Sequence, residues 1–312
     1  MTALSYEVVA FNTAKESENR IHDDAVARRF GFTGGLVPGV DVYAYMTHPP
    51  VARWGRDWLE RGTAWCRFAK PVYDGNRATV TQADDGPSVA LEVESDGVLC
   101  ATGGATLGPA PEPPSLADWP APPTPPATRP PADADSLPEG RWLGIPPLHV
   151  TPDFAAKYHD DVRETHPIYH RDHLIHPGLI LRMCNWALTA NVMLGPWIHV
   201  GSAVTNIAAG RVGETLSVRA RVARNYAHKG HLFVDLDALV LADEHRPLAR
   251  IAHTAIYRPR QVFRLPIWRT FTNVWLQFLR AVSACVLLIT AFFGDWSGLP
   301  FAVLLLGFFW SG

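Results

Sequence analysis

Residues 17–40 read SENRIHDDAVARRFGFTGGLVPGV, and the fold prediction depends on this stretch. A polar segment leads to His22, and the two aspartates that follow favour the start of a short helix, because acidic side chains complement the partial positive charge of a helix N-terminus. A glycine follows where that helix would end. Pro38 and Gly39 then open an apolar run that is typical of a buried helix.

The second part of the chain repeats this order of signals. HPIY at 166–169 corresponds to NRIH at 19–22, and Pro177 and Gly178 open a second apolar helix. Each helix is followed by segments in which apolar and polar residues alternate, as in TLSVRARVARNY and LARIAHTAIYR, and this is typical of half-buried antiparallel strands. The repeat predicts an α+β fold in which each half wraps an antiparallel sheet around a central helix.

A proline-rich segment separates the two halves. Residues 109–138 contain 12 prolines in 30 positions, and proline removes backbone donors and excludes the interior of helices and sheets. We expect an extended linker that acts as a spacer, or alternatively as a ligand for an SH3-type domain. The predicted domains are therefore an N-terminal half at 1–108, the linker, a C-terminal half at 139–260 and an apolar tail at 261–312.

Composition narrows the class of protein. A net charge of -2 argues against nucleic-acid binding, which needs a basic surface. The cysteines have neither metal-ligand nor disulfide spacing and the N-terminus does not read as a signal peptide, so the sequence predicts a cytoplasmic protein. These cysteines are Cys66, Cys100, Cys184 and Cys285.

The C-terminal tail leaves three interpretations open. Residues 281–310 contain no Lys or Arg and form two apolar arms around a polar break. Each arm has about 13 residues, fewer than the ~20 that a membrane-spanning helix needs. Arginines precede the run, as they do on a cytoplasmic flank. The tail is a membrane anchor or hairpin, an apolar segment packed on the domain or a partner, or an end unrelated to the rest.

These residues resemble the hot-dog fold, and within it the MaoC-like enoyl-CoA hydratase/dehydratase superfamily. The matching positions of the first half are Asn19, Ile21, His22, Asp24, Ala27, Gly31 and Gly39. The segment RFAKPVYDGNRATV is also similar to the family's strand and turn. The resemblance covers most of residues 5–108 and, more weakly, 150–259, and it implies a double hot-dog, a fused pseudo-dimer.

The first half departs from the family's catalytic motif. Ser17 stands in the place of the family's aspartate, with Glu16 and Glu18 on either side. Arg20 replaces the proline of the motif, and Pro38 replaces the histidine before the helix glycine. The first half therefore keeps the histidine of the Asp–His pair and lacks the aspartate.

The second half departs in the opposite way. Glu164 takes the aspartate position, and Tyr169 replaces the histidine. Nine positions separate Tyr169 from Gly178, against seventeen between His22 and Gly39. We therefore expect the short helix of the first half to be missing from the second.

The resemblance implies reversible addition of water to a 2-enoyl thioester, with an acyl-CoA as substrate and no cofactor. Such a reaction needs a base for water, a proton for the α-carbon and donors for the charge on the thioester oxygen. His22 is the candidate acid and base, because its ordinary pKa of ~6.5 is close to neutrality, and Ser17 and Asn19 complete this motif. Gly39 and Gly178 are candidate donors, because the first N–H groups of a helix lack partners within it.

Each of these assignments has a structural alternative. His22 and its aspartates also fit an ordinary helix start, and Pro-Gly begins many helices and turns. Glu164 and Tyr169 form a carboxylate–phenol pair, complement His22 across the pseudo-dimer interface, or belong to a degenerate half that only supports the fold. The remaining histidines considered lack ligand spacing and are interpreted as surface or core residues: His48, His149, His159, His228, His231 and His253.

Three functions therefore stay open. The first is hydration or dehydration of an acyl-CoA. The second is thioester hydrolysis, with Glu16, Glu18 or Glu164 activating water. The third is a non-catalytic module that binds acyl-CoA or lipid, which the incomplete motifs favour. The chain is expected to be a monomeric pseudo-dimer or a homodimer.

Overall fold

The strands of both halves join in a single antiparallel sheet within residues 4–29 and 31–260, the part of the chain that the computed structural model describes. The first half contributes β1 (Leu4–Val9), β2 (Gly62–Phe68), β3 (Arg77–Asp85), β4 (Ser88–Ser95) and β5 (Val98–Leu107). The second contributes β6 (Trp142–Leu143), β7 (Leu148–His149), β8 (Ile198–Asn206), β9 (Thr215–His228), β10 (His231–Ala242) and β11 (Arg246–Arg258). The order across the sheet is β1-β3-β4-β5-β2-β8-β11-β10-β9-β6, with β7 also on β9.

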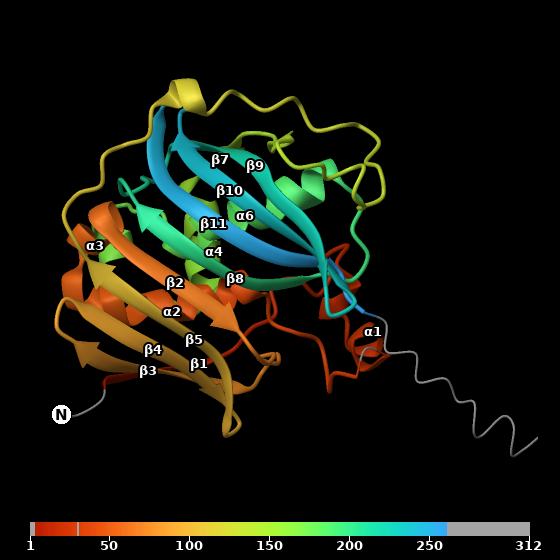
Figure 1. Cartoon of the computed structure of the whole chain (residues 1–312). Helices are drawn as coiled ribbons and strands as arrows, with labels where there is room; N and C mark the ends of the chain where they lie inside the picture. Colours follow the sequence, from red (N-terminus) through yellow and green to blue (C-terminus); the bar gives the residue numbers. More distant parts are fainter. Residues whose placement is uncertain (1–3, 30, 261–312) are drawn as a thin grey trace, which may run out of the picture. The chain divides into compact units, whose positions relative to one another are not determined.

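The two halves meet where β2 pairs with β8. This pairing is antiparallel and runs from Thr63 opposite Thr205 to Arg67 opposite Gly201. On either side of it the strands follow in matching order, β5, β4, β3 and β1 on one side and β11, β10 and β9 on the other. Each half is therefore a copy of the other about the β2–β8 seam, as the sequence repeat predicts (Figure 1).

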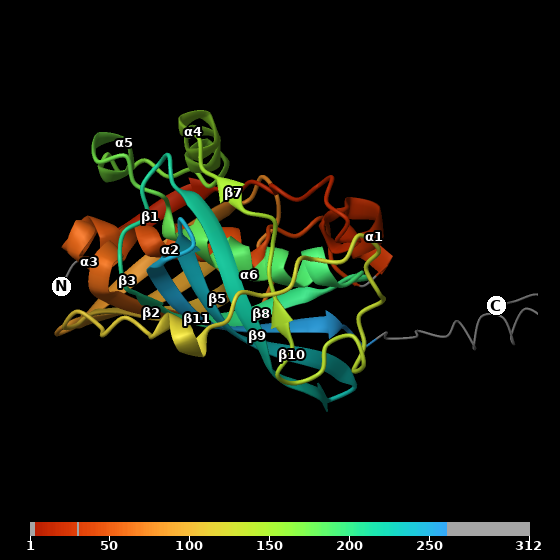
Figure 2. The same ribbon diagram turned by 90° about the horizontal axis from the view of Figure 1, so that it is seen from above.

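Each half wraps its strands around one central helix. These are α2 (Gly39–Trp54) and α6 (Pro177–Asn191), which pack against each other behind the sheet (Figures 1 and 2). Most side chains of α2 are buried, among them Tyr43, Tyr45 and Met46. A helix that is apolar on nearly all sides is stable only inside a core, and this explains the long apolar run of the sequence.

The short helices distinguish the two halves. The first half has η1 (Arg20–His22), α1 (Asp24–Arg29) and α3 (Arg56–Arg61), and the second has α4 (Pro152–Asp161) and α5 (Ile168–Arg171). Gly55, with a left-handed φ of 59°, separates α2 from α3. Among the described residues, α1 has no counterpart between α5 and α6, in agreement with the shorter spacing there.

The proline-rich segment, residues 109–138, lies along the second half. It contains one short turn, η2 (Leu116–Asp118), and Trp119 after it packs with Leu239 and Leu241 of β10. Near its end, Ala132 N donates to Met193 O at 3.0 Å. The segment is thus largely without helix or strand, and it contacts the protein at separate points such as Trp119 and Ala132, while most of its residues are exposed.

The predicted apolar tail, residues 261–312, lies outside the described residues. For the part of the chain that is described, no helix combines the length and apolar character that crossing a membrane requires.

The close approach of β2 and β8 predicts a cost for any side chain at Gly201. A Cβ there would lie 2.5 Å from the carbonyl oxygen of Cys66 on β2. We expect Gly201→Ala to lower the free energy of unfolding by about 1–3 kcal/mol, because the strands must move apart. Gly195→Ala is the control, since a Cβ at Gly195 meets no atom within 4 Å. Equal denaturation midpoints for the two variants would contradict this account of the seam.

Candidate active site

His22 is held in one tautomer by the backbone. Its Nδ1 lies 2.6 Å from the carbonyl oxygen of Leu36, and a carbonyl only accepts, so Nδ1 carries the proton. Nε2 is then unprotonated and accepts a hydrogen bond from Asn19 Nδ2 at 3.2 Å. Burial lowers the pKa of His22 below its ordinary value. His22 is therefore neutral at physiological pH and presents a proton acceptor.

Asn19 joins the His22 segment to the second half. Its side chain donates to Trp197 O at 3.1 Å and accepts from Trp197 N at 3.2 Å. The two bonds resemble the paired hydrogen bonds between neighbouring antiparallel strands, and they lie just before β8. Asn19 therefore connects the His22 segment to the second half.

The N-terminus of α2 lies beside His22 and is uncapped. Gly39 is the first helical residue, and Pro38 before it supplies no side-chain cap among the residues that the structure describes. The first N–H groups of this helix therefore lack a capping side chain and carry the partial positive charge of the helix dipole. Gly39 itself is packed closely, since a Cβ there would lie 2.9 Å from His199 Nδ1 and 3.1 Å from Phe68.

Two adjoining cavities meet at His22. The first, of about 180 Å³, is called here the apolar cavity, and the second, of about 490 Å³, the polar cavity. Five residues line both cavities: Asn19, His22, Pro38, Asn185 and Trp197. The apolar cavity is further lined by residues such as Ile21, Phe32, Leu36, Val42, Phe68 and Val72. The polar cavity is further lined by residues such as Thr13, Ser17, Glu18, Arg129, Arg182 and Thr189.

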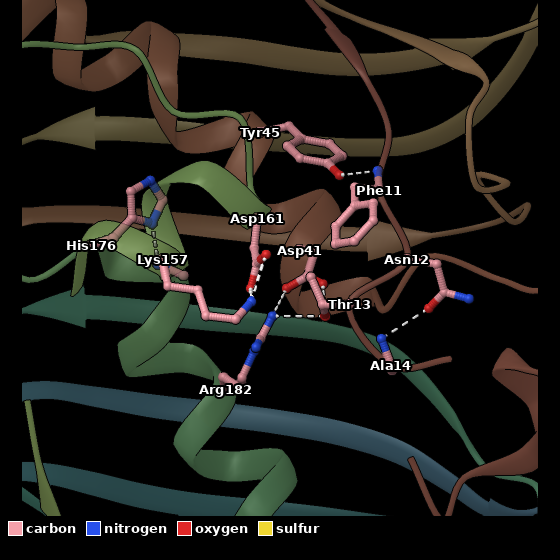
Figure 3. Close-up of polar contacts among 11 residues, drawn as sticks. Phe11, Asn12, Thr13, Ala14, Asp41, Tyr45, Lys157, Asp161, His176 and Arg182 are labelled. Atoms are coloured by element: carbon pink, nitrogen blue, oxygen red, sulfur yellow. Dashed lines mark hydrogen bonds and ion pairs between the residues drawn. The ribbon is translucent and has the colours of Figure 1, made fainter. Parts of the chain in front are cut away.

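A buried ion pair supports the wall of the polar cavity. Arg182 of α6 pairs with Asp41, whose side chain is fully buried in the first turn of α2. Thr13 Oγ1 donates to Asp41 Oδ2 at 2.6 Å and accepts from Arg182 Nη2 at 3.2 Å (Figure 3). The pair crosses between the two halves, so it fixes α2 against α6 beside the site.

The first-half motif contains no carboxylate bonded to His22. Within the described residues, the ring nitrogens of His22 contact only Leu36 and Asn19. Ser17, which replaces the family's aspartate, lines the polar cavity, and its hydroxyl donates to Asn19 O at a long 3.4 Å. Glu18 is exposed and is paired with Arg129 at 2.8 Å. Glu18 is therefore bound to Arg129 and forms no hydrogen bond with His22.

Glu164 is bound by histidines of both halves, His48 of α2 and His176 at the start of α6. Its carboxylate accepts from His48 Nδ1 at 2.7 Å, from His176 Nε2 at 3.3 Å and from the backbone N–H of His166 at 2.6 Å. Burial alone would raise the pKa of Glu164, but the hydrogen bonds from His176 and His48 hold it well below its usual range. The prediction that His48 is an ordinary surface or core residue is therefore incomplete, because its ring is one of the partners of Glu164.

The N-terminus of α6 is capped by a side chain. His176 is the N-cap of α6, and its Nδ1 accepts from Gly178 N at 3.0 Å. Tyr169 is buried, and its hydroxyl has no hydrogen-bond partner in the described chain. The carboxylate–phenol pair of Glu164 and Tyr169 is therefore not formed, and Gly178 does not present a free N–H. Neither of the two cavities at His22 is lined by these residues.

Sequence reasoning missed several residues that line these cavities. Asn185 and Arg182 lie on α6, and His199 lies on β8, all of them in the half opposite to His22. None of them stands in a motif, so only the pairing of the two halves brings them to the site. Over the described ranges, no group of three His, Cys, Asp or Glu side chains is placed to hold a metal ion.

Solved structures place this geometry in a known fold. A conserved protein from Mycobacterium tuberculosis, described as having a double hot-dog fold, is 15% identical over 82% of this chain and 96% of its own, with a TM-score of 0.53. The chain has a double hot-dog fold. A MaoC domain protein dehydratase from Chloroflexus aurantiacus is 11% identical over 83% of this chain and 96% of its own, with a TM-score of 0.55.

A third double hot-dog neighbour is a MaoC-like dehydratase that is 12% identical over 82% of this chain and 98% of its own, with a TM-score of 0.51. No protein-family model and no curated protein sequence matches the chain. The likeness therefore lies in the fold, and it confirms the fold that the sequence motifs predicted.

The buried histidines predict how stability depends on pH. Burial lowers the pKa of His253 to about 3 and that of His159 to about 4, the latter helped by the nearby His176 and His170. The unfolded chain takes up these protons near pH ~6.5. The free energy of unfolding should therefore fall as pH decreases from about 6.5 towards 4, by up to about 1.4 kcal/mol per pH unit for each such histidine.

Urea unfolding between pH 7.5 and 5 would measure this slope. His253→Gln should reduce this slope by the contribution of one proton, because glutamine does not titrate. Gly195→Ala is the control, because it adds no titratable group and its Cβ would meet no atom within 4 Å, so it should leave the slope unchanged. A wild-type chain whose stability is the same at pH 7.5 and pH 5 would contradict the assignment.

Proposed function

We propose that this chain is an acyl-thioester enzyme that adds water to a 2-enoyl thioester, or removes it in reverse, at the first-half site. The observation that carries the proposal is the position of His22, a neutral base beside the uncapped N-terminus of α2 at the junction of two cavities. The double hot-dog fold of the dehydratase neighbours supports the same reaction class.

In this proposal each chemical requirement is met by a group of the chain. The thioester oxygen binds the first-turn N–H groups of α2 at Gly39, where the helix dipole stabilises the negative charge of the enolate. His22 Nε2 accepts a proton from water, and the water oxygen forms a bond to the β-carbon. The imidazolium of His22 returns that proton to the α-carbon, so the proton count is balanced on one residue. Ser17 and Asn19 contribute polar atoms that hold the water and the ring.

Only the site at the N-terminus of α2 is proposed to be catalytic. At the N-terminus of α6 the N–H of Gly178 is bound by His176, and Glu164 is held by two histidines. Glu164, Tyr169 and Gly178 are therefore proposed to support the fold. Two other functions would use the same site. Thioester hydrolysis would follow if water attacked the carbonyl carbon of the thioester instead of the β-carbon. Binding of an acyl-CoA without reaction is favoured by the missing aspartate of the motif.

Turnover assays on the full chain test this proposal. We expect the wild type to hydrate one or more of short, medium-length and branched 2-enoyl-CoAs, and His22→Ala to lower kcat by about 100-fold or more, because general base catalysis is lost. The acid limb of kcat/KM should lie below pH ~6.5, because burial lowers the pKa of His22.

Tyr169→Phe is the matched test of the second half. It removes only a buried hydroxyl without a described partner, so kcat should stay within about twofold of the wild type. Release of free CoA thiol would instead show hydrolysis, and calorimetric binding of acyl-CoA without any product would show a binding module. Full activity of His22→Ala would exclude the proposed base.

A further inference from the structure

His199 lies on the wall of the apolar cavity, against the residue that begins α2. It is 6% exposed, and a Cβ on Gly39 would lie 2.9 Å from its Nδ1. This Nδ1 is buried and has no hydrogen-bond partner within residues 4–29 and 31–260. A buried polar atom without a partner is costly, so its presence beside the uncapped helix N-terminus indicates a ligand group that satisfies it.

The other nitrogen of His199 belongs to a short hydrogen-bonded chain. Its Nε2 lies 2.9 Å from Ser202 Oγ, and the same hydroxyl lies 3.0 Å from His253 Nδ1. The two imidazole rings are stacked, with centroids 4.3 Å apart. All three side chains are buried between β8 and β11, so water does not replace these contacts.

This chain has two arrangements of its protons, because the hydroxyl of Ser202 holds one. When Ser202 donates to His199 Nε2, His199 carries its own proton on Nδ1, and His253 Nδ1 donates to the hydroxyl oxygen. In the reverse arrangement His199 Nε2 donates to Ser202, Ser202 donates to His253, and His199 Nδ1 is bare. Only the first arrangement makes His199 a donor at the cavity.

We propose that His199 is a further catalytic residue of this site, whose Nδ1–H donates a hydrogen bond to the thioester carbonyl oxygen beside the first-turn N–H groups of α2. Ser202 and His253 are positioning residues that keep the proton on Nδ1. This inference rests on the proposed function, because it requires an acyl thioester at Gly39.

The environment suits a neutral donor. Burial lowers the pKa of His199 well below its ordinary value, and the neighbouring His253 acts in the same direction. A neutral imidazole polarises the carbonyl without giving up its proton, so His22 keeps the role of acid and base. A donor that is already oriented before the reaction is most effective where charge develops in the transition state.

Isotope-edited infrared spectroscopy tests the contact directly. The probe is butyryl-CoA labelled with ¹³C at the thioester carbonyl, which is saturated and cannot be hydrated. Bound to the full wild-type chain, its carbonyl stretch should move to lower frequency than in solution. His199→Phe, which keeps a ring against Gly39, should reverse part of this shift and lower kcat about 100-fold with KM changed less than about threefold.

Two variants separate a donor from a packing role. His199→Gln keeps a donor of similar reach and should retain more of the carbonyl shift and of kcat than His199→Phe. Ser202→Ala should cost about tenfold in kcat and release the proton from Nδ1, which long-range ¹H–¹⁵N spectra of the histidine rings report. His159→Phe is the matched control, a buried histidine without a described partner that lines neither cavity.

The outcomes distinguish this inference from the proposed function. If the wild type neither binds nor converts acyl-CoAs, the proposed function fails and this inference fails with it. If the wild type is active but His199→Phe matches it in kcat and carbonyl frequency, only the role of His199 is overturned. Equal losses in His199→Phe, His199→Gln and His159→Phe would show a packing role and would also overturn it.

Discussion

The structure depends on the antiparallel pairing of β2 with β8. This pairing joins two half-sheets into one and brings α2 and α6 together behind them. Each half alone would leave a long central strand edge unpaired and one side of its helix uncovered, and both are unfavourable in water. The same pairing places Trp197 next to Asn19, so the seam that stabilises the fold also assembles the site from both halves.

The N-termini of the two central helices differ in whether a side chain caps them. At α2 the N-cap is Pro38, which supplies no described side-chain cap, and the adjoining space is hollow. At α6 the N-cap is His176, whose ring takes the N–H of Gly178 and donates in turn to Glu164. Two copies of one architecture therefore differ in how their helix N-termini are capped: the first faces a cavity without a described side-chain cap, and the second is capped by the ring of His176.

Much of this fold could be predicted from the sequence, because its signals are local. The Pro-Gly helix starts at Gly39 and Gly178, the alternation in β9 and β11, and the shorter second spacing all correspond to elements of the structure. The residues of the site could be predicted only in part. His22 and Asn19 lie in one motif, but His199 lies in none, because only the folded structure brings it beside Gly39, 160 positions earlier in the chain.

Other interactions of the site also depend on distant parts of the chain. The sequence placed an acid near Ser17, in Glu16 or Glu18, but it could not show that Glu18 is paired with Arg129. It could not show the cap on Gly178 either, because the orientation of His176 is decided by its contact with Glu164. Such assignments need the three-dimensional arrangement of charges, whereas helix starts need only the order of residues.

The linker between the two halves contributes to the cavity as well as joining them. Its Arg129 donates to Thr189 O at 2.7 Å on α6, pairs with Glu18 of the first half and lines the polar cavity. The segment that joins the two halves is therefore also part of the wall of the polar cavity. If the two halves were separate polypeptides, β2 could still pair with β8, but one of them would have to carry the linker around Arg129 to complete this wall. Covalent fusion here adds surface to the cavity as well as proximity.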